Sequence, residues 1–208
     1  MISKIALSLK IAGVISVLAL LALLWRLAPY IEYAAVGPRS GDVLCRESSG
    51  GTEGRFFEIL TPGGINECGV LTHSRWRWYV KDFNGTAHNV RLMKWIFRSR
   101  GRFAVLRAES AQNGITIPVR EKLNENDGKQ MSFPDFYGAK VISGWYVSEL
   151  KIRAGAETDV SSGTAAALKA AGYNVPAGTK IITPKSLALS DSFNAVFVSG
   201  IETGRTKR

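Results

Sequence analysis

The alternation of hydrophobic and polar positions divides the chain into one long apolar segment near its N-terminus and a mixed remainder. Residues 5–25, IALSLKIAGVISVLALLALLW, contain a single charge, Lys10. An α-helix of this length is about 31 Å long, close to the hydrocarbon thickness of a bilayer, about 30 Å. Trp25 lies at the end of the segment, where aromatic residues gather at membrane interfaces. The pattern predicts a transmembrane helix in contact with lipid through residues 5–25.

A cleaved secretory signal peptide is the alternative interpretation of the same segment. Cleavage needs small residues at the last and third-last positions before the cut, and bulky residues continue here as far as Arg26. The sequence therefore favours an uncleaved signal anchor, which we assign to residues 1–30. Pro29 should end its helix near Leu27 or Ala28.

Residues 31–54 lack a hydrophobic period and are rich in residues that break regular structure. Gly37-Pro38 and the run from Ser48 to Gly51 are typical of loops. We therefore expect a flexible linker over 31–54 that lets the following domain move away from the membrane.

Residues 55–153 show short alternating segments separated by turn residues, which indicates an antiparallel β domain. We expect strands at 55–60, 102–108 and 140–153, with a polar loop at 121–132. The clearest signal is Asn84-Gly85 between two alternating segments, which is typical of a two-residue hairpin turn.

This hairpin has two chemically different faces. With Asn84-Gly85 at its centre, opposed residue numbers sum to 169, so Trp76 faces Met93, Ser74 faces Trp95 and Trp78 faces Arg91. One face is aromatic, and its Trp76, Trp78 and Trp95 are interpreted as core residues. The other, which we call the cationic hairpin face, is a candidate binding surface made of Arg75, Arg77, Lys81, His88 and Lys94.

The last 50 residues combine a helix with short strands. Residues 164–171, TAAALKAA, should form a helix that Ser161 or Ser162 caps and Gly172 ends. Strands are expected at 179–183 and 193–199, so residues 154–200 form a small α+β appendage that closes the same domain. The basic tail, 201–208, should be disordered. The fold class is one N-terminal transmembrane helix followed by an α+β, mainly antiparallel β, domain with a short helix near the C-terminus.

Charge adds a preference for anionic partners. The 208 residues carry a formal net charge of +10. From Arg26 onward, 25 basic and 17 acidic residues leave +8. A basic domain beside a membrane attracts anionic head groups or polyanions, and nucleic acid only if it lies in the cytoplasm.

The two cysteines favour an oxidising compartment. Cys45 and Cys68 form an even pair in one region, which suits a single disulfide worth about 3 kcal/mol of stability. Two free thiols in a cytoplasmic domain are the alternative. We place the N-terminus in the cytoplasm and the domain in the periplasm of a single-pass inner-membrane protein, because the N-terminal tail is short.

The sequence shows no pattern that assigns a catalytic, cofactor or metal site. It lacks GxSxG, HExxH and GxGxxG, and the only histidines, His73 and His88, fall about 25 Å apart in the 169 register. Whether the protein is an enzyme is undecided, and the balance favours a non-enzymatic role. The favoured function is a structural or assembly subunit of a bacterial envelope complex that contacts other membrane or envelope proteins. The alternatives are an anion-binding module that uses the cationic hairpin face and a membrane-tethered hydrolase, for example one with a Ser–Lys pair.

Overall fold

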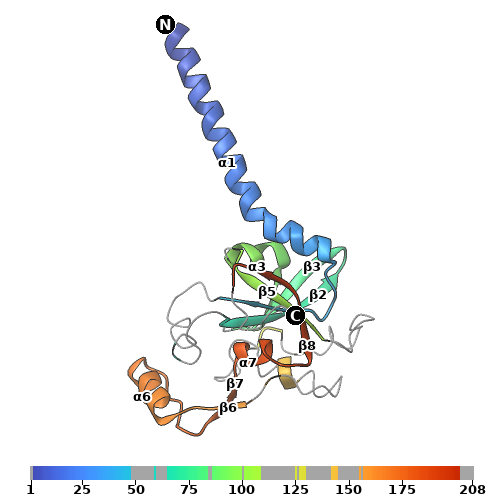
Figure 1. Ribbon diagram of the computed structural model, residues 1–208, viewed down its shortest axis with the longest axis vertical. Coiled ribbons are helices and arrows are strands. Elements are labelled where there is room, and N and C mark those ends of the chain that lie inside the picture. Colours follow the sequence, from blue (N-terminus) through green and yellow to red (C-terminus); the bar gives the residue numbers. More distant parts are fainter. Residues whose placement is uncertain are drawn as a thin grey trace.

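The computed structural model shows a long N-terminal helix that ends on a sheet domain (Figure 1). It describes residues 2–47, 59, 65–83, 86–99, 101–108, 125, 127–129, 142–144, 155 and 157–201. The α+β, mainly antiparallel architecture predicted from the sequence is confirmed.

The main sheet has six antiparallel strands in the order β4-β3-β2-β1-β5-β8. The strand that follows the N-terminal helix, β1, therefore lies in the interior of the sheet, between β2 and β5. The strands are β1 (Val43–Arg46), β2 (Glu67–Ser74), β3 (Arg77–Asp82), β4 (His88–Arg91), β5 (Phe103–Ala108) and β8 (Phe193–Ser199).

Alternate side chains of these strands supply two apolar layers, one on each face of the sheet. One layer packs beneath α1 (Ile2–Val36) and α3 (Leu92–Arg98), and it contains Leu44, Leu71 and Val105. The other, with Val43 and Val70, packs against Leu187 of α7 (Pro184–Ala188). The sheet is thus covered by helical residues on both faces.

The N-terminal helix α1 is longer than predicted and enters the domain directly. It runs to Val36 with Pro29 inside it, so the prediction that Pro29 ends the helix is wrong. Proline removes one backbone hydrogen bond, and Figure 1 shows the helix bending where it reaches the domain. The Pro29 ring lies so close to the turn after α3 that a Cβ at Gly101 would come within 3.1 Å of it.

Packing of the last turns of α1 explains why the helix continues past the proline. Tyr33 is fully buried between Phe103 of β5 and Phe197 of β8, and Tyr30 packs against the same cluster. The linker predicted over 31–54 is therefore wrong for residues 31–36, which are helical, and for 43–46, which form β1.

A buried carboxylate joins this helix to the sheet. The Tyr33 hydroxyl donates to Asp42 at 3.0 Å, and Arg107 of β5 donates to both oxygens of Asp42 at 2.8 and 2.7 Å. The backbone N–H of Arg39 adds a fourth hydrogen bond. The bond to Asp42 raises the pKa of Arg107, which keeps the guanidinium charged. Asp42 thus fixes the connection between α1 and β1.

The hairpin predicted around Asn84-Gly85 exists in a different register. Strands β3 and β4 pair with Asp82 opposite His88 and Tyr79 opposite Arg91, so opposed numbers sum to 170. The second strand stops at Arg91, because residues 92–98 form α3 with Leu92, Trp95 and Ile96 buried at helical spacing. The predicted opposition of Trp76 to Met93, Ser74 to Trp95 and Trp78 to Arg91 is wrong.

The two cysteines form the predicted disulfide. Cys45 of β1 and Cys68 of β2 are directly opposed and are joined inside the core. The next pair along, Leu44 and Gly69, needs the glycine, since a Cβ there would lie 2.5 Å from the Val80 side chain. The disulfide therefore links two adjacent interior strands of the sheet.

The C-terminal region follows the prediction closely. Helix α6 (Ser162–Ala170) begins after Ser161, whose hydroxyl accepts from the Thr164 N–H at 3.1 Å, and Gly172 follows with φ 92°. Strand β7 (Lys180–Ile182) pairs with β6 (Glu157–Asp159) in a separate two-stranded sheet, whereas β8 joins the main sheet. The connection between β7 and β8 contains α7.

Several predictions fall largely outside the described residues. These are the strand at 55–60, where only helical Ile59 is described, the loop at 121–132 and the tail at 201–208. Within the strand predicted at 140–153, the described residues 142–144 are helical, so that prediction is wrong there.

We predict that Tyr33→Ala destabilises the domain by about 3–5 kcal/mol, because it leaves a cavity among Phe103 and Phe197 and removes a donor to Asp42. Urea unfolding in mild detergent, followed by near-UV circular dichroism, measures the loss. Ile31→Ala, on the exposed side of the same helix, is the matched control and should change stability little. Equal effects of the two substitutions would contradict the docking of α1.

Candidate functional site

The structure does not bring the five residues of the predicted cationic hairpin face together on one exposed surface. Arg75 lies in the β2–β3 turn, Arg77 begins β3, and both are exposed. His88 is exposed on β4, and Lys94 is exposed on α3. The predicted sum of 169 would also place Arg75 directly opposite Lys94, and this opposition is wrong.

Lys81 does not belong to an exposed surface at all. Its side chain is 0% exposed, and its ammonium lies 2.7 Å from the Asp127 carboxylate. The position faces the apolar layer that contains its cross-strand partner, Val70. Lys81 is thus a buried, paired cation that ties β3 to the segment around residue 127.

The two histidines lie on β2 and β4, separated by β3. His73 pairs with Trp78, and their rings contact at a tilt of 50° with 4.6 Å between centroids, whereas His88 pairs with Asp82. Their partners on β3 are four residues apart, about 13 Å along the strand, and not the 25 Å expected from the earlier register. The separation is still too large for one shared ion.

The turn between β2 and β3 has an unusual composition for its backbone geometry. Arg75 and Trp76 both have positive φ, 46° and 69°, as the two central residues of a type I′ turn do. Asn-Gly is preferred in such turns, since positive φ costs other residues about 1–2 kcal/mol each. Among the described residues, these are the only ones other than glycine with positive φ.

The same turn carries the most exposed tryptophan that the structure describes. Trp76 is 95% exposed, so its predicted role as a core residue is wrong. Trp95 is buried as predicted, and Trp78 is partly buried against the layer beneath α1. The turn therefore holds a large aromatic side chain in solvent, between two exposed arginines, at a cost in backbone strain.

A second candidate site is a buried cluster of charges at the other end of β2. Arg46 of β1 donates to Glu67 of β2 at 2.6 Å, and its guanidinium lies 3.5 Å from Asp82 of β3. All three side chains are nearly fully buried. Arg46 also donates to the Trp95 carbonyl at 3.1 Å and lies over the Trp95 ring at 4.5 Å.

This cluster escaped the sequence analysis, although the sequence carries a signal for it. Arg46 directly follows Cys45, and Glu67 directly precedes Cys68. A disulfide between opposed positions of antiparallel strands places the next residue of one strand opposite the preceding residue of the other. The disulfide prediction therefore already implied an Arg46–Glu67 pair.

Comparison with known proteins identifies the fold but no family. No known protein-family description matches the sequence, and no curated protein matches it either. Among solved structures, the chain is similar to the metalloprotein yiiX (DUF1105) from Escherichia coli O157:H7. The TM-score is 0.65 and the sequence identity 21%, over 77% of this chain and 97% of that one. At this identity the similarity shows a shared fold alone.

The described residues do not fit a metal centre of the kind that the word metalloprotein suggests. Within the described ranges, no three His, Cys, Asp or Glu side chains come together. The carboxylates of Glu67 and Asp82 converge on the Arg46 guanidinium, and both cysteine sulfurs are in the disulfide. We therefore derive no chemistry that passes through a metal.

We predict that Arg46→Met destabilises the protein by about 3–5 kcal/mol, because it leaves the buried carboxylates of Glu67 and Asp82 without their cation. Denaturant unfolding of the purified protein measures this. Arg102→Met is the matched control, since Arg102 pairs with Glu47 on an exposed surface and should contribute about 0–1 kcal/mol. A stable Arg46→Met protein would show that the cluster is not a structural charge pair.

Proposed function

We propose that the protein is a single-pass, membrane-anchored, non-enzymatic subunit of a bacterial envelope complex. Its domain lies in the periplasm and holds other membrane or envelope proteins in a fixed position. Residues Lys10–Val36 of α1 are long and apolar enough to cross a membrane, and this segment lies near the N-terminus.

The observation that carries this proposal is the rigid connection between the anchor and the domain. The helix passes from its apolar segment into the core without a linker, through Tyr33 and the Asp42 hydrogen bonds. A flexible tether gives a domain reach, whereas a docked helix gives it one orientation relative to the bilayer. A fixed orientation is useful to a subunit that must position partners.

The disulfide and the charge cluster support the same proposal. A buried disulfide indicates an oxidising compartment, which favours the periplasm for the domain. The buried carboxylates of Glu67 and Asp82 are engaged by Arg46 instead of facing a substrate. This use of buried charge favours a structural role over a hydrolytic one.

Binding of anionic lipid or polyanions remains the second candidate function. It is favoured by Arg75 and Arg77, which are exposed and have no ion pair within the described part of the chain. These two residues form a cationic surface at the β2–β3 turn. It is smaller than the cationic hairpin face that the sequence predicted.

We expect a topology reporter that works only outside the cytoplasm to be active when fused after Arg208. A reporter that works only inside should be silent. In the same membranes, denatured protein should show no free thiol before reduction, because Cys45 and Cys68 are bonded. The reverse reporter pattern, or two free thiols, would contradict the periplasmic placement.

We expect the native protein to migrate with other chains when it is extracted in mild detergent and sized. A flexible Gly-Ser segment inserted between Trp25 and Arg26 should reduce these co-migrating chains, because it frees the docked part of the helix from the span. The same segment added after Arg208 is the control and should have no effect. A lone monomer, or full assembly with the inserted tether, would refute the subunit proposal.

A further inference from the structure

We propose that the protein touches the bilayer a second time, through a lipid-facing surface made of residues 31–36 of α1 and the β2–β3 turn. The occupant is the head-group region of the membrane into which α1 inserts, with a preference for anionic lipid. The inference takes from the proposed function only that α1 anchors the protein in the membrane. It concerns this chain and lipid alone, so it can fail or hold independently of any partner protein.

The length of α1 is the first reason. Its 35 residues span about 52 Å, whereas a hydrocarbon core is about 30 Å thick. The bend where the helix meets the domain turns its last part across the top of the sheet (Figure 1). That part is therefore available to lie along the membrane surface instead of crossing it.

The outward side of this last part is apolar. Ile31 and Val36 are 56% and 42% exposed, Ala34 and Ala35 are also exposed, and Glu32 is the only charged residue of α1 after Arg26. A helix lying on a domain in water normally shows polar residues outward. Here the inward side packs through Tyr30 and Tyr33, so both sides are apolar. An apolar outward side is stable in contact with lipid.

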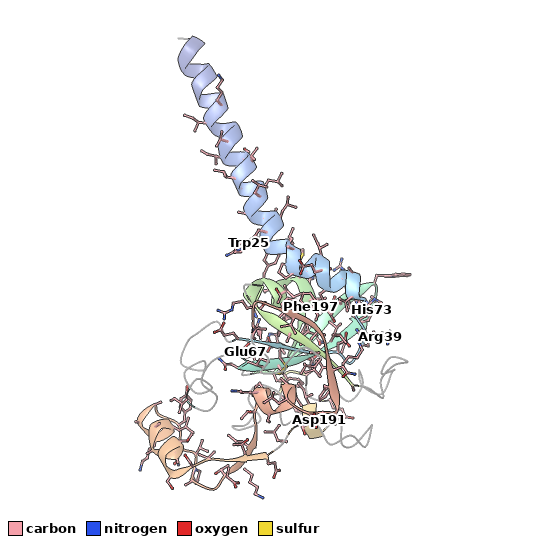
Figure 2. The ribbon with its side chains drawn as sticks, viewed as in Figure 1. Trp25, Arg39, Glu67, His73, Asp191 and Phe197 are labelled. Atoms are coloured by element: carbon pink, nitrogen blue, oxygen red, sulfur yellow. A yellow bond between two sulfur atoms is a disulfide. The ribbon has the colours of Figure 1, made fainter. Side chains whose placement is uncertain are left out.

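The β2–β3 turn follows the part of β2 that pairs with the segment leading out of α1. Leu71 of β2 exchanges backbone hydrogen bonds with Gly41 and Asp42, and it packs in the same cluster as Tyr33. The turn begins three residues after Leu71, about 10 Å along the strand. Figure 2 shows His73, near the end of β2, at about the level of the C-terminal end of α1 along the long axis of the molecule.

The chemistry of the turn matches a head-group region. Exposed tryptophans are enriched at membrane interfaces, where the ring contacts hydrocarbon and the indole N–H contacts water. Arg75 and Arg77 flank Trp76 and can bind lipid phosphates. The Arg75-Trp76 backbone is strained although Asn-Gly would fit the turn without strain, and strained backbone is concentrated at functional sites.

The test replaces the turn by its unstrained equivalent. Full-length protein carrying Trp25→Phe, which removes the tryptophan at the span, is reconstituted alone in lipid nanodiscs with brominated acyl chains. It is compared with the same protein carrying Arg75→Asn and Trp76→Gly. Bromine quenches only tryptophans that reach the acyl region. We expect bromine to quench the emission of one more tryptophan in the Trp25→Phe parent protein than in the turn variant.

Two further measurements separate the lipid contact from a folding defect. The turn variant should unfold at a temperature about 4 °C higher, because its backbone strain is relieved. Arg75→Gln/Arg77→Gln should lower quenching in anionic nanodiscs to the level seen with zwitterionic lipid. Lys169→Gln/Lys185→Gln removes the same charge from α6 and α7, which lie on the side of the domain away from α1, and should change nothing (Figure 1).

Equal quenching of the parent and the turn variant would overturn the proposal and would leave Trp76 as a contact for a protein partner. A lower unfolding temperature for the turn variant would overturn the strain argument on which the proposal depends. Loss of co-migrating chains from native membranes has no bearing on this result, since the nanodiscs contain no other protein.

Discussion

The carboxylate of Asp42 is the interaction on which the arrangement of this protein depends. It accepts hydrogen bonds from Tyr33 of α1, from Arg107 of β5 and from the backbone of Arg39. Its side chain is almost completely buried, so loss of the Arg107 guanidinium would leave a buried charge without its cation. The helix that follows the membrane span and the strand that starts the domain thus meet at a single charged group.

The two buried carboxylate systems differ in what they hold together. Asp42 joins a helix to the sheet, whereas Glu67 and Asp82 join three neighbouring strands through Arg46 and anchor Trp95 of α3 above them. Both lie on the face of the sheet covered by α1 and α3. Buried charge in this domain therefore fixes the two helices on one face, while the opposite face relies on apolar contacts, the disulfide and Lys81.

Local signals in the sequence predicted local features well and failed where packing decided. Ser161 and Gly172 gave the limits of α6, and the two cysteines gave the disulfide. Pro29 did not end α1, because burial of Tyr33 outweighs one lost backbone hydrogen bond. Residues 92–98 alternate enough to resemble a strand, but they form a helix whose Leu92, Trp95 and Ile96 pack on the sheet.

The candidate site shows the same division. No sequence signal marks the turn at Arg75-Trp76, because these residues are unfavourable at positive φ. Placing Asn84-Gly85 at the centre of the hairpin gave a register that differs by one residue from the observed one. The Arg46–Glu67 pair was implicit in the cysteine spacing, whereas the approach of Asp82 and Trp95 depends on β3 and α3. Backbone strain in a turn and contacts between residues far apart in the chain are difficult to predict from a single sequence.

The position of β1 in the sheet has a consequence for biosynthesis. This strand is the first to be made after the anchor, yet its two neighbours are β2, about 20 residues later, and β5, about 60 residues later. The edge strand β8 follows β1 by about 150 residues, and its Phe197 packs against Tyr33. An early strand held at the membrane would thus serve as a template for the later ones. The helix would therefore complete its packing on the domain only after β8 had been synthesised.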